Sequence, residues 1–111
     1  MTGLYAESHG IVASHMYDPV SKKTFYIGKH SDSAWWNAAR PLWITAQDSG
    51  YKTAAMMWPG SDVAIGNRTA SHFLPYDKKM TFQQRLEKVI KWMSGDGKVE
   101  KSLPYFYWHF A

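Results

Sequence analysis

The sequence contains no cysteine, which excludes a disulfide framework and any thiolate metal site within these 111 residues. It also lacks an apolar run of transmembrane length, and no signal peptide precedes Met1. If the parent protein is secreted, we expect its targeting segment to lie outside this sequence. There is no internal repeat and no low-complexity tract, and the length allows one domain at most.

A clustered basic face is also missing. The formal net charge is +4, but the lysine pairs at 22–23, 78–79 and 98/101 are scattered, with acidic residues between them. Nucleic-acid binding needs the basic residues on one face. We therefore interpret the charge as an ordinary solvated surface and expect no nucleic-acid-binding module.

Aromatic residues, in contrast, are abundant: the chain has six Trp, seven Tyr and five Phe. A small core needs far fewer rings. Trp and Tyr combine flat apolar faces with a polar group, so they also suit pocket walls and interfaces. We expect many of these rings to pack against parts of a larger domain.

Four segments predict the fold class. A helix is expected to start at Pro41 and end at Gly50, and a buried strand to follow over 51–58. A second helix is expected from Thr81 to Gly95, and an aromatic strand over 103–110. Strands that are apolar on both faces and alternate with helices indicate a parallel sheet covered by helices. We predict an α/β fold in which the two strands are neighbours or near neighbours.

The helix from Thr81 is the clearest element. Thr81 and Gln84 have the spacing of a capping box, in which each side chain satisfies a free backbone donor of the other residue. An apolar stripe at helical spacing follows, made of Phe82, Leu86, Val89, Ile90 and Met93.

The remaining segments have weaker patterns. Ile11–Ala13 is a candidate for a short extended segment, and 14–37 is irregular, with buried points expected at Phe25-Tyr26 and Trp35-Trp36. Residues 63–76 are loop-rich, with at most one short strand.

Two sets of polar residues suggest chemistry. Asn67-Arg68-Thr69 is an N-glycosylation sequon in a polar loop, which makes Asn67 a candidate site. A metal site is the less favoured interpretation of the second set, because zinc needs three or four converging ligands and no pair has ligand spacing. That set consists of Glu7, His9, His15, His30, His72 and His109.

Several motifs together resemble the nucleotide pyrophosphatase/phosphodiesterase family of the alkaline phosphatase superfamily. Two of them are highly informative, GLYAESHGIV at 3–12 and MWPGSDV at 57–63. Taken alone, the Trp58-Pro59-Gly60 part of the second could simply be a strand end with a ring over a turn. The motifs MYD at 16–18, WWN at 35–37, PLWIT at 41–45 and FQQR at 82–85 extend the resemblance over nearly the whole chain, closest to the branch of members four and five.

The resemblance implies a partial alkaline-phosphatase-like domain, with residues 1–111 forming a fragment of the catalytic domain. In the family, a threonine attacks the phosphoryl centre between two zinc ions. The position of that threonine precedes Met1, and the zinc-binding Glu-Pro-Asp-x-x-Gly-His and Asp-His-Gly motifs are not in this sequence. We therefore expect no catalytic residue and no zinc ligand here, and no hydrolysis by residues 1–111 alone.

The resemblance implies two substrate-binding residues. The tyrosine that matches Tyr76 presents its face to the nucleotide base, although from the sequence alone Tyr76 would be an exposed loop ring. Ser14 stands where the family has an asparagine that helps to bind the phosphoryl oxygen. A serine hydroxyl has a shorter reach than an asparagine amide, so we expect weakened turnover in the parent protein.

Two functions are therefore open. The first is a segment of the substrate-pocket wall in a zinc-dependent ecto-phosphodiesterase that hydrolyses phosphodiester or pyrophosphate bonds of nucleotides. Its parent would be extracellular or on the cell surface, with or without a membrane anchor. The alternative is a truncated, non-catalytic family member that at most binds a nucleotide or a protein weakly. The resemblance leaves the preferred nucleotide or other phosphodiester substrate undetermined.

Overall fold

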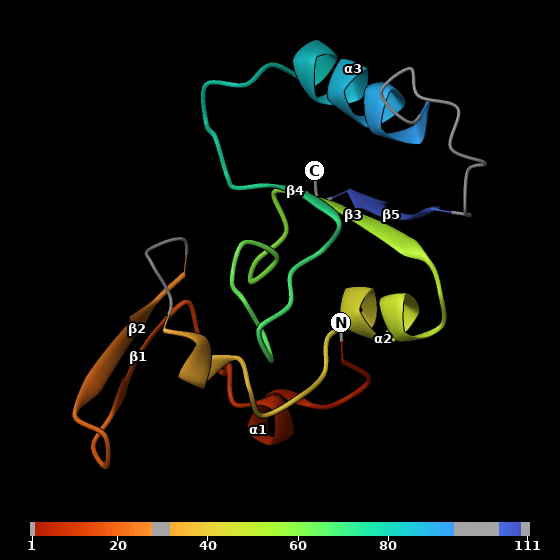
Figure 1. Cartoon of the computed structure of the whole chain (residues 1–111). Coiled ribbons are helices and arrows are strands. Elements are labelled where there is room, and N and C mark those ends of the chain that lie inside the picture. Colours follow the sequence, from red (N-terminus) through yellow and green to blue (C-terminus); the bar gives the residue numbers. More distant parts are fainter. Residues whose placement is uncertain (1, 28–31, 95–104, 110–111) are drawn as a thin grey trace.

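The computed structural model describes residues 2–27, 32–94 and 105–109, the last of these as backbone (Figure 1). Within the described residues, no helix is both long and apolar enough to cross a bilayer. The elements in chain order are α1 (Ala6–His9), β1 (His15–Asp18), β2 (Lys23–Tyr26), the 3-10 helix η1 (Ser33–Trp35), α2 (Leu42–Asp48), β3 (Lys52–Met56), β4 (His72–Leu74), α3 (Phe82–Met93) and β5 (Tyr105–His109).

A parallel sheet in the order β4-β3-β5 forms the centre of the fold. β3 pairs with β4 in the register Ala54↔His72 and with β5 in the register Ala54↔Tyr107, both parallel. The predicted α/β class and the pairing of the two buried strands are therefore confirmed. The loop-rich segment 63–76 contains one short strand, β4, as expected; residues 103, 104 and 110 of the predicted aromatic strand lie outside the described residues.

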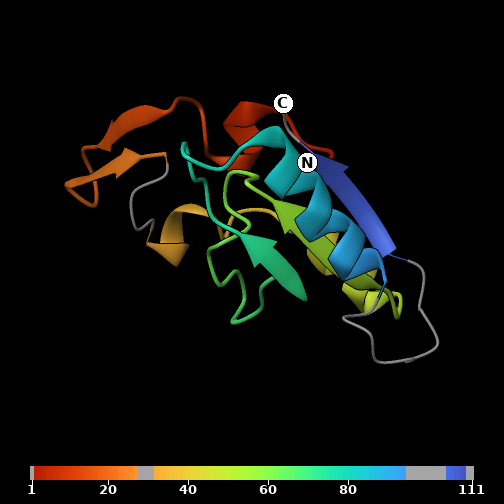
Figure 2. The same cartoon turned by 90° about the horizontal axis from the view of Figure 1, so that it is seen from above.

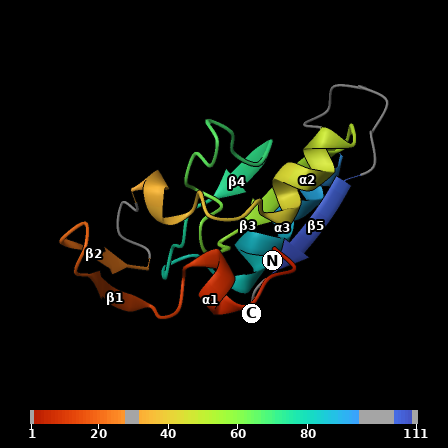
Figure 3. The same ribbon diagram turned by 90° about the horizontal axis from the view of Figure 1, so that it is seen from below.

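The sheet is covered by one helix on each face. Figure 1 shows α3 on one side of β3 and β5 and α2 on the other, and Figures 2 and 3 show the same layers from above and below. Pro41 precedes α2, and Gly50, in the left-handed conformation (φ 86°), follows its C-cap Ser49. The helix boundaries predicted from Pro41 and Gly50 are thus confirmed.

Successive residues of β3 build two separate cores. Ala55 packs with Trp43 and Ile44 of α2, together with Val63 and Ile65 from the loop after β3. On the opposite face, Ala54 and Met56 pack with Met57 and with Val89 and Trp92 of α3. This two-sided burial is what a strand in the middle of a parallel sheet requires.

Helix α3 begins with the predicted capping box. Thr81 Oγ1 accepts a hydrogen bond from the backbone N–H of Gln84 (3.3 Å), and Gln84 Oε1 accepts one from the N–H of Thr81 (2.9 Å). α3 ends at Met93 with Ser94 as C-cap, and the expected end at Gly95 lies outside the described residues.

The apolar stripe of α3 is buried only in part. Val89 is buried, and so is Trp92, which the sequence pattern did not include. Val89 and Trp92 pack against Ala54 and Met56 of β3. The other members of the stripe are exposed: Phe82, Leu86, Ile90 and Met93.

The prediction of an irregular segment over 14–37 is wrong. β1 and β2 form an antiparallel hairpin from His15↔Tyr26 to Asp18↔Lys23, which projects from the rest of the fold (Figure 1). The Asp18 carboxylate closes its turn by accepting hydrogen bonds from the N–H groups of Val20 (3.0 Å) and Ser21 (3.2 Å). A hydrogen bond from the Ser21 hydroxyl, together with these two backbone bonds, holds the pKa of Asp18 below its ordinary value.

A single side chain of the hairpin is fully buried. Phe25 lies with its ring centroid 5.6 Å from those of both Trp35 and Trp36. The buried points expected at Phe25 and in the Trp35-Trp36 pair are confirmed in part, since Phe25 is buried and the two tryptophans are half-buried, whereas Tyr26 is exposed. Residues 11–13, the candidate extended segment, form no strand.

The burial of β3 predicts a sharp contrast between two methionines. Met56 is fully buried and Met93 is 58% exposed. We expect Met56→Ala to lower the free energy of unfolding by about 2–5 kcal/mol because it leaves a cavity. Met93→Ala is the matched control and should change it by no more than about 0.5 kcal/mol. Both variants can be compared by urea unfolding of the shortest stretch of the parent protein that unfolds in one cooperative transition. Similar losses of unfolding free energy in the two variants would contradict the assignment of the core.

Candidate substrate-side site

The carboxyl edge of the three-stranded sheet is the candidate site. Ligands of open α/β sheets bind outside the carboxyl ends of the strands. Here β3 ends at Met56, and the next backbone N–H, that of Met57, donates to the carbonyl of Leu74 at the end of β4 (2.8 Å). This bond ties the segments that leave β3 and β4 together.

The turn after β3 is rigidly held. The Ser61 hydroxyl donates to the carbonyl of Trp58 (2.7 Å), and the Ser61 backbone N–H donates to the same oxygen (3.1 Å). Gly60 has a φ of 82°, and a Cβ placed there would lie 2.5 Å from Cζ3 of Trp36. Only glycine therefore allows the backbone to pass so close to the indole ring.

Tyr76 lies two residues beyond the end of β4, on the loop that leads to α3. Its side chain is 70% exposed, so one face of the ring is accessible to a ligand. The Asp77 carboxylate accepts a hydrogen bond from the N–H of Lys79 (2.8 Å) and shapes the loop that follows. The expected exposed loop position is confirmed; the role in base binding stays a prediction.

Ser14 lies immediately before β1 and is exposed. Its carbonyl accepts a hydrogen bond from the N–H of Ile27 (2.9 Å), which closes the open end of the hairpin. Among the contacts of the described residues, no hydrogen bond involves the Ser14 hydroxyl, and none joins Ser14 to Tyr76. The role of Ser14 in phosphate binding also stays a prediction.

A cavity of about 190 Å³ lies beside the turn after β3. Ile27, the partner of Ser14, lines it together with Trp58, and so do Trp36 and Trp43. The indole N–H groups of Trp36 and Trp43 are buried and have no acceptor among the described residues. Neither Ser14 nor Tyr76 lines this cavity; Ile27, whose N–H binds the Ser14 carbonyl, does.

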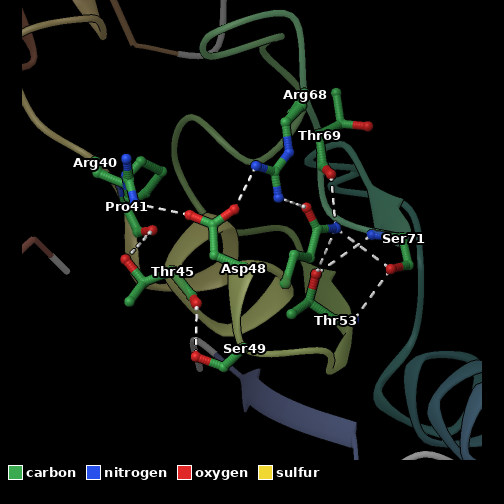
Figure 4. Close-up of polar contacts among 10 residues, drawn as sticks. Arg40, Pro41, Thr45, Asp48, Ser49, Thr53, Arg68, Thr69 and Ser71 are labelled. Atoms are coloured by element: carbon green, nitrogen blue, oxygen red, sulfur yellow. Dashed lines mark hydrogen bonds and ion pairs between the residues drawn. The ribbon is translucent and has the colours of Figure 1, made fainter.

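A polar network supports the opposite, amino-terminal edge of the sheet (Figure 4). The Gln47 side-chain amide donates to Thr53 Oγ1 (3.0 Å), to the carbonyl of Thr69 (2.9 Å) and to Ser71 Oγ (3.3 Å). These contacts join the end of α2 to the beginning of β3 and to the segment before β4. The network thereby fixes both strands in the register that brings their carboxyl ends together.

Asp48 adds two ion pairs to this network. Its carboxylate binds Arg68 at 2.5 Å and Arg40 at 2.7 Å. The hydrogen bond from Arg68 holds the pKa of Asp48 below its ordinary value, and the positive charges of both arginines act in the same direction. Because the pair is partly exposed, it contributes to the position of the loop more than to stability.

The histidines considered as metal ligands have other contacts. His9 Nδ1 accepts a hydrogen bond from the N–H of Ile11 (3.2 Å), His15 stacks on Tyr26 with centroids 4.2 Å apart, and His72 stacks near Trp92 at 5.9 Å. Within the part of the chain that the structure describes, no three His, Cys, Asp or Glu side chains could hold a metal together. His30 and the side chain of His109 lie outside the described part.

Comparison with known proteins decides the family. The family model described as type I phosphodiesterase / nucleotide pyrophosphatase matches residues 1–110. The chain belongs to this family. The chain is 41% identical over 108 residues to human ectonucleotide pyrophosphatase/phosphodiesterase family member 5, and 50% identical over 95 residues to mouse bis(5'-adenosyl)-triphosphatase enpp4. These matches cover 96% and 85% of the chain but only 23% and 21% of the relatives.

Solved structures of the family agree with the fold. The chain matches the human member 5 structure with a TM-score of 0.80 at 40% identity, covering 94% of the chain and 27% of that structure. An inactive variant of murine member 5 in complex with AMP matches with a TM-score of 0.79 at 39% identity, covering 96% and 29%. The predicted membership and the partial alkaline-phosphatase-like fold are confirmed.

The sequence did not predict the cavity or the tryptophans that line it. WWN at 35–37 and WPG at 58–60 were recognised as motifs, but nothing in either shows that Trp36 packs on Gly60. The plain interpretation of Trp58-Pro59-Gly60 is confirmed in part, because a turn follows β3, but the strand ends at Met56 and Trp58 is only half-buried. The available signal was the coincidence of two tryptophan-containing motifs with a glycine that needs a left-handed conformation.

The packing of Trp36 against Gly60 gives a testable expectation. Gly60→Ala introduces both a disfavoured φ and a clash with the ring, so it should lower the free energy of unfolding by clearly more than about 1 kcal/mol. Gly66→Ala is the matched control, because Gly66 has a φ of 60° and open space around it, and it should cost only about 1 kcal/mol. Thermal or urea unfolding compares the two variants. Equal losses of unfolding free energy would show that the Trp36 ring moves aside to accommodate the new methyl group.

Proposed function

We propose that the complete protein hydrolyses phosphodiester or pyrophosphate bonds of nucleotides and that this chain supplies part of its substrate-side wall. The observation that carries the proposal is the 41–50% identity to nucleotide pyrophosphatase/phosphodiesterase relatives throughout the segment that builds the carboxyl edge. One relative is named for the hydrolysis of a bis-adenosyl triphosphate, and the structure of another contains AMP. A nucleotide with an adenine base is therefore the first substrate class to test.

Tyr76 would bind the base. Its ring is exposed on the loop that leaves the carboxyl end of β4, and the capping box at Thr81 holds the other end of that loop. Stacking of a base on an aromatic ring contributes about 1–3 kcal/mol and tolerates different bases. This position gives the pocket a platform for the base beyond the end of the sheet.

Ser14 would contribute to the cradle for the phosphate. Its hydroxyl is exposed and makes no hydrogen bond within the described part of the chain, so it can donate to a phosphoryl oxygen. The hydrogen bond between its carbonyl and the N–H of Ile27 holds its backbone beside a residue that lines the cavity. The family has asparagine here, and the serine makes this donor the weak point of the site.

The nucleophile and the zinc ions would come from other parts of the complete protein. The described residues do not fit a zinc site, because no three ligand side chains converge. When bound, zinc would act as a Lewis acid toward the phosphoryl oxygens. Residues 1–111 alone should therefore be inactive, and the alternative, a non-catalytic member that only binds nucleotide, remains the other outcome of the tests below.

An extracellular or cell-surface location completes the proposal. It rests on the similarity to relatives named as ectonucleotide pyrophosphatases/phosphodiesterases. A membrane anchor would lie in another part of the parent protein.

The base platform can be tested in the full-length protein. Tyr76→Ala should raise KM for a dinucleoside polyphosphate by about 5- to 150-fold, the equivalent of 1–3 kcal/mol of lost stacking. Tyr76→Phe keeps the ring and should stay near the native value. Tyr51→Ala removes a tyrosine beside the amino end of β3 and is the control for general effects. An unchanged KM in Tyr76→Ala would remove the platform from the proposal.

The phosphate cradle makes a separate prediction about rate. Ser14→Asn should increase kcat of the full-length protein, by at most about 10²–10³-fold, because it restores a donor of longer reach to the phosphoryl oxygen. Ser14→Ala should not increase it. Equal rates for the native protein and Ser14→Asn on a chromogenic thymidine phosphodiester would contradict the assignment. If no variant turns over substrate, equilibrium binding of AMP to the native protein should be measured. Binding without turnover would support the non-catalytic alternative.

A further inference from the structure

The loop between β3 and β4 contains a tight turn at its tip. The backbone N–H of Ile65 donates to the carbonyl of Arg68 (3.0 Å), and the N–H of Arg68 donates back to Ile65 (3.2 Å). The two central residues, Gly66 and Asn67, both have a φ of 60°. This is the type I′ geometry, in which asparagine is one of the few side-chain-bearing residues that is readily tolerated.

An oligosaccharyltransferase recognises the asparagine amide and the threonine hydroxyl of the sequon, and both are available here. Asn67 is exposed, and within the described residues its side-chain amide makes no hydrogen bond. The Thr69 hydroxyl also carries no contact (Figure 4). The polar network uses the neighbouring groups instead: the Arg68 guanidinium binds Asp48, and the carbonyl of Thr69 accepts from Gln47.

There is space for a glycan, and it would not obstruct the candidate site. A Cβ added at Gly66 would meet no atom within 4 Å, so the tip of the turn is open. The Gln47 side-chain amide hydrogen-bonds to Thr69 and also to Thr53 and Ser71, which lie at the amino-terminal ends of β3 and β4. The turn is thus tied to the end of the sheet opposite to the carboxyl edge that Tyr76 follows.

We propose that Asn67 carries an N-linked glycan in the mature protein. The proposal rests on the extracellular location included in the proposed function, and it is independent of catalysis. The sugar would occupy the polar surface formed by α2 and the 65–68 turn, where Asp48 and Arg68 already keep the backbone fixed. Its attachment would require no side chain to give up an existing hydrogen bond.

The test uses the full-length protein secreted from a vertebrate cell line. Release of the glycan by peptide N-glycosidase in ¹⁸O-labelled water should mark Asn67 as labelled aspartate in the peptide mass spectrum. Thr69→Ala should abolish the label without changing Asn67, and Thr69→Ser should keep it. Since the Thr69 carbonyl remains in both variants, the contact with Gln47 is preserved.

The outcomes separate this proposal from the proposed function. An unlabelled Asn67 in the native protein, or retention of the protein in the cytosol, overturns the glycan, whatever the activity. A labelled Asn67 in a protein without phosphodiesterase activity supports the glycan and counts against the proposed function. Asn67→Gln should leave phosphodiester hydrolysis unchanged, because the turn lies at the opposite end of the sheet from the carboxyl edge.

Discussion

The burial of β3 on both faces is the constraint on which the other elements depend. Ala54 and Met56 face α3, and Thr53 and Ala55 face α2, so the strand has no solvent-exposed side after Lys52. Adjacent alanines in this strand give each helix a small side chain to pack against, Ala55 for α2 and Ala54 for α3. The position of the loop after β3 depends on this arrangement, because its first residues continue a strand that is held on both faces.

The two edges of the sheet are held by different contacts. At the amino-terminal edge, Gln47 satisfies groups from β3 and from the segment before β4, and Asp48 holds the loop through Arg68. At the carboxyl edge, one backbone bond joins Met57 to Leu74, and the exposed ring of Tyr76 follows two residues later. Polar contacts gather at the first edge, and Tyr76, which we propose to bind the base, follows the second.

The parts predicted from sequence are those governed by local rules. The capping box at Thr81 and the helix between Pro41 and Gly50 depend on a few adjacent residues, and the buried strands on an uninterrupted apolar pattern. The hairpin was missed because its four-residue strands are mostly exposed and depend on the Asp18 turn. The exposed stripe of α3 and the Trp36–Gly60 contact depend on distant segments. The roles of Ser14 and Tyr76 were inferred only from resemblance and stay predictions.

Met57 has a φ of 53° although it is not a glycine. A residue with a Cβ in the left-handed region persists only where its surroundings impose that conformation, at a cost of about 1–3 kcal/mol. Here burial of the side chain and the hydrogen bond to Leu74 impose it. The chain therefore leaves the central strand in a single direction, and the segment carrying Trp58 is preorganised before any ligand arrives.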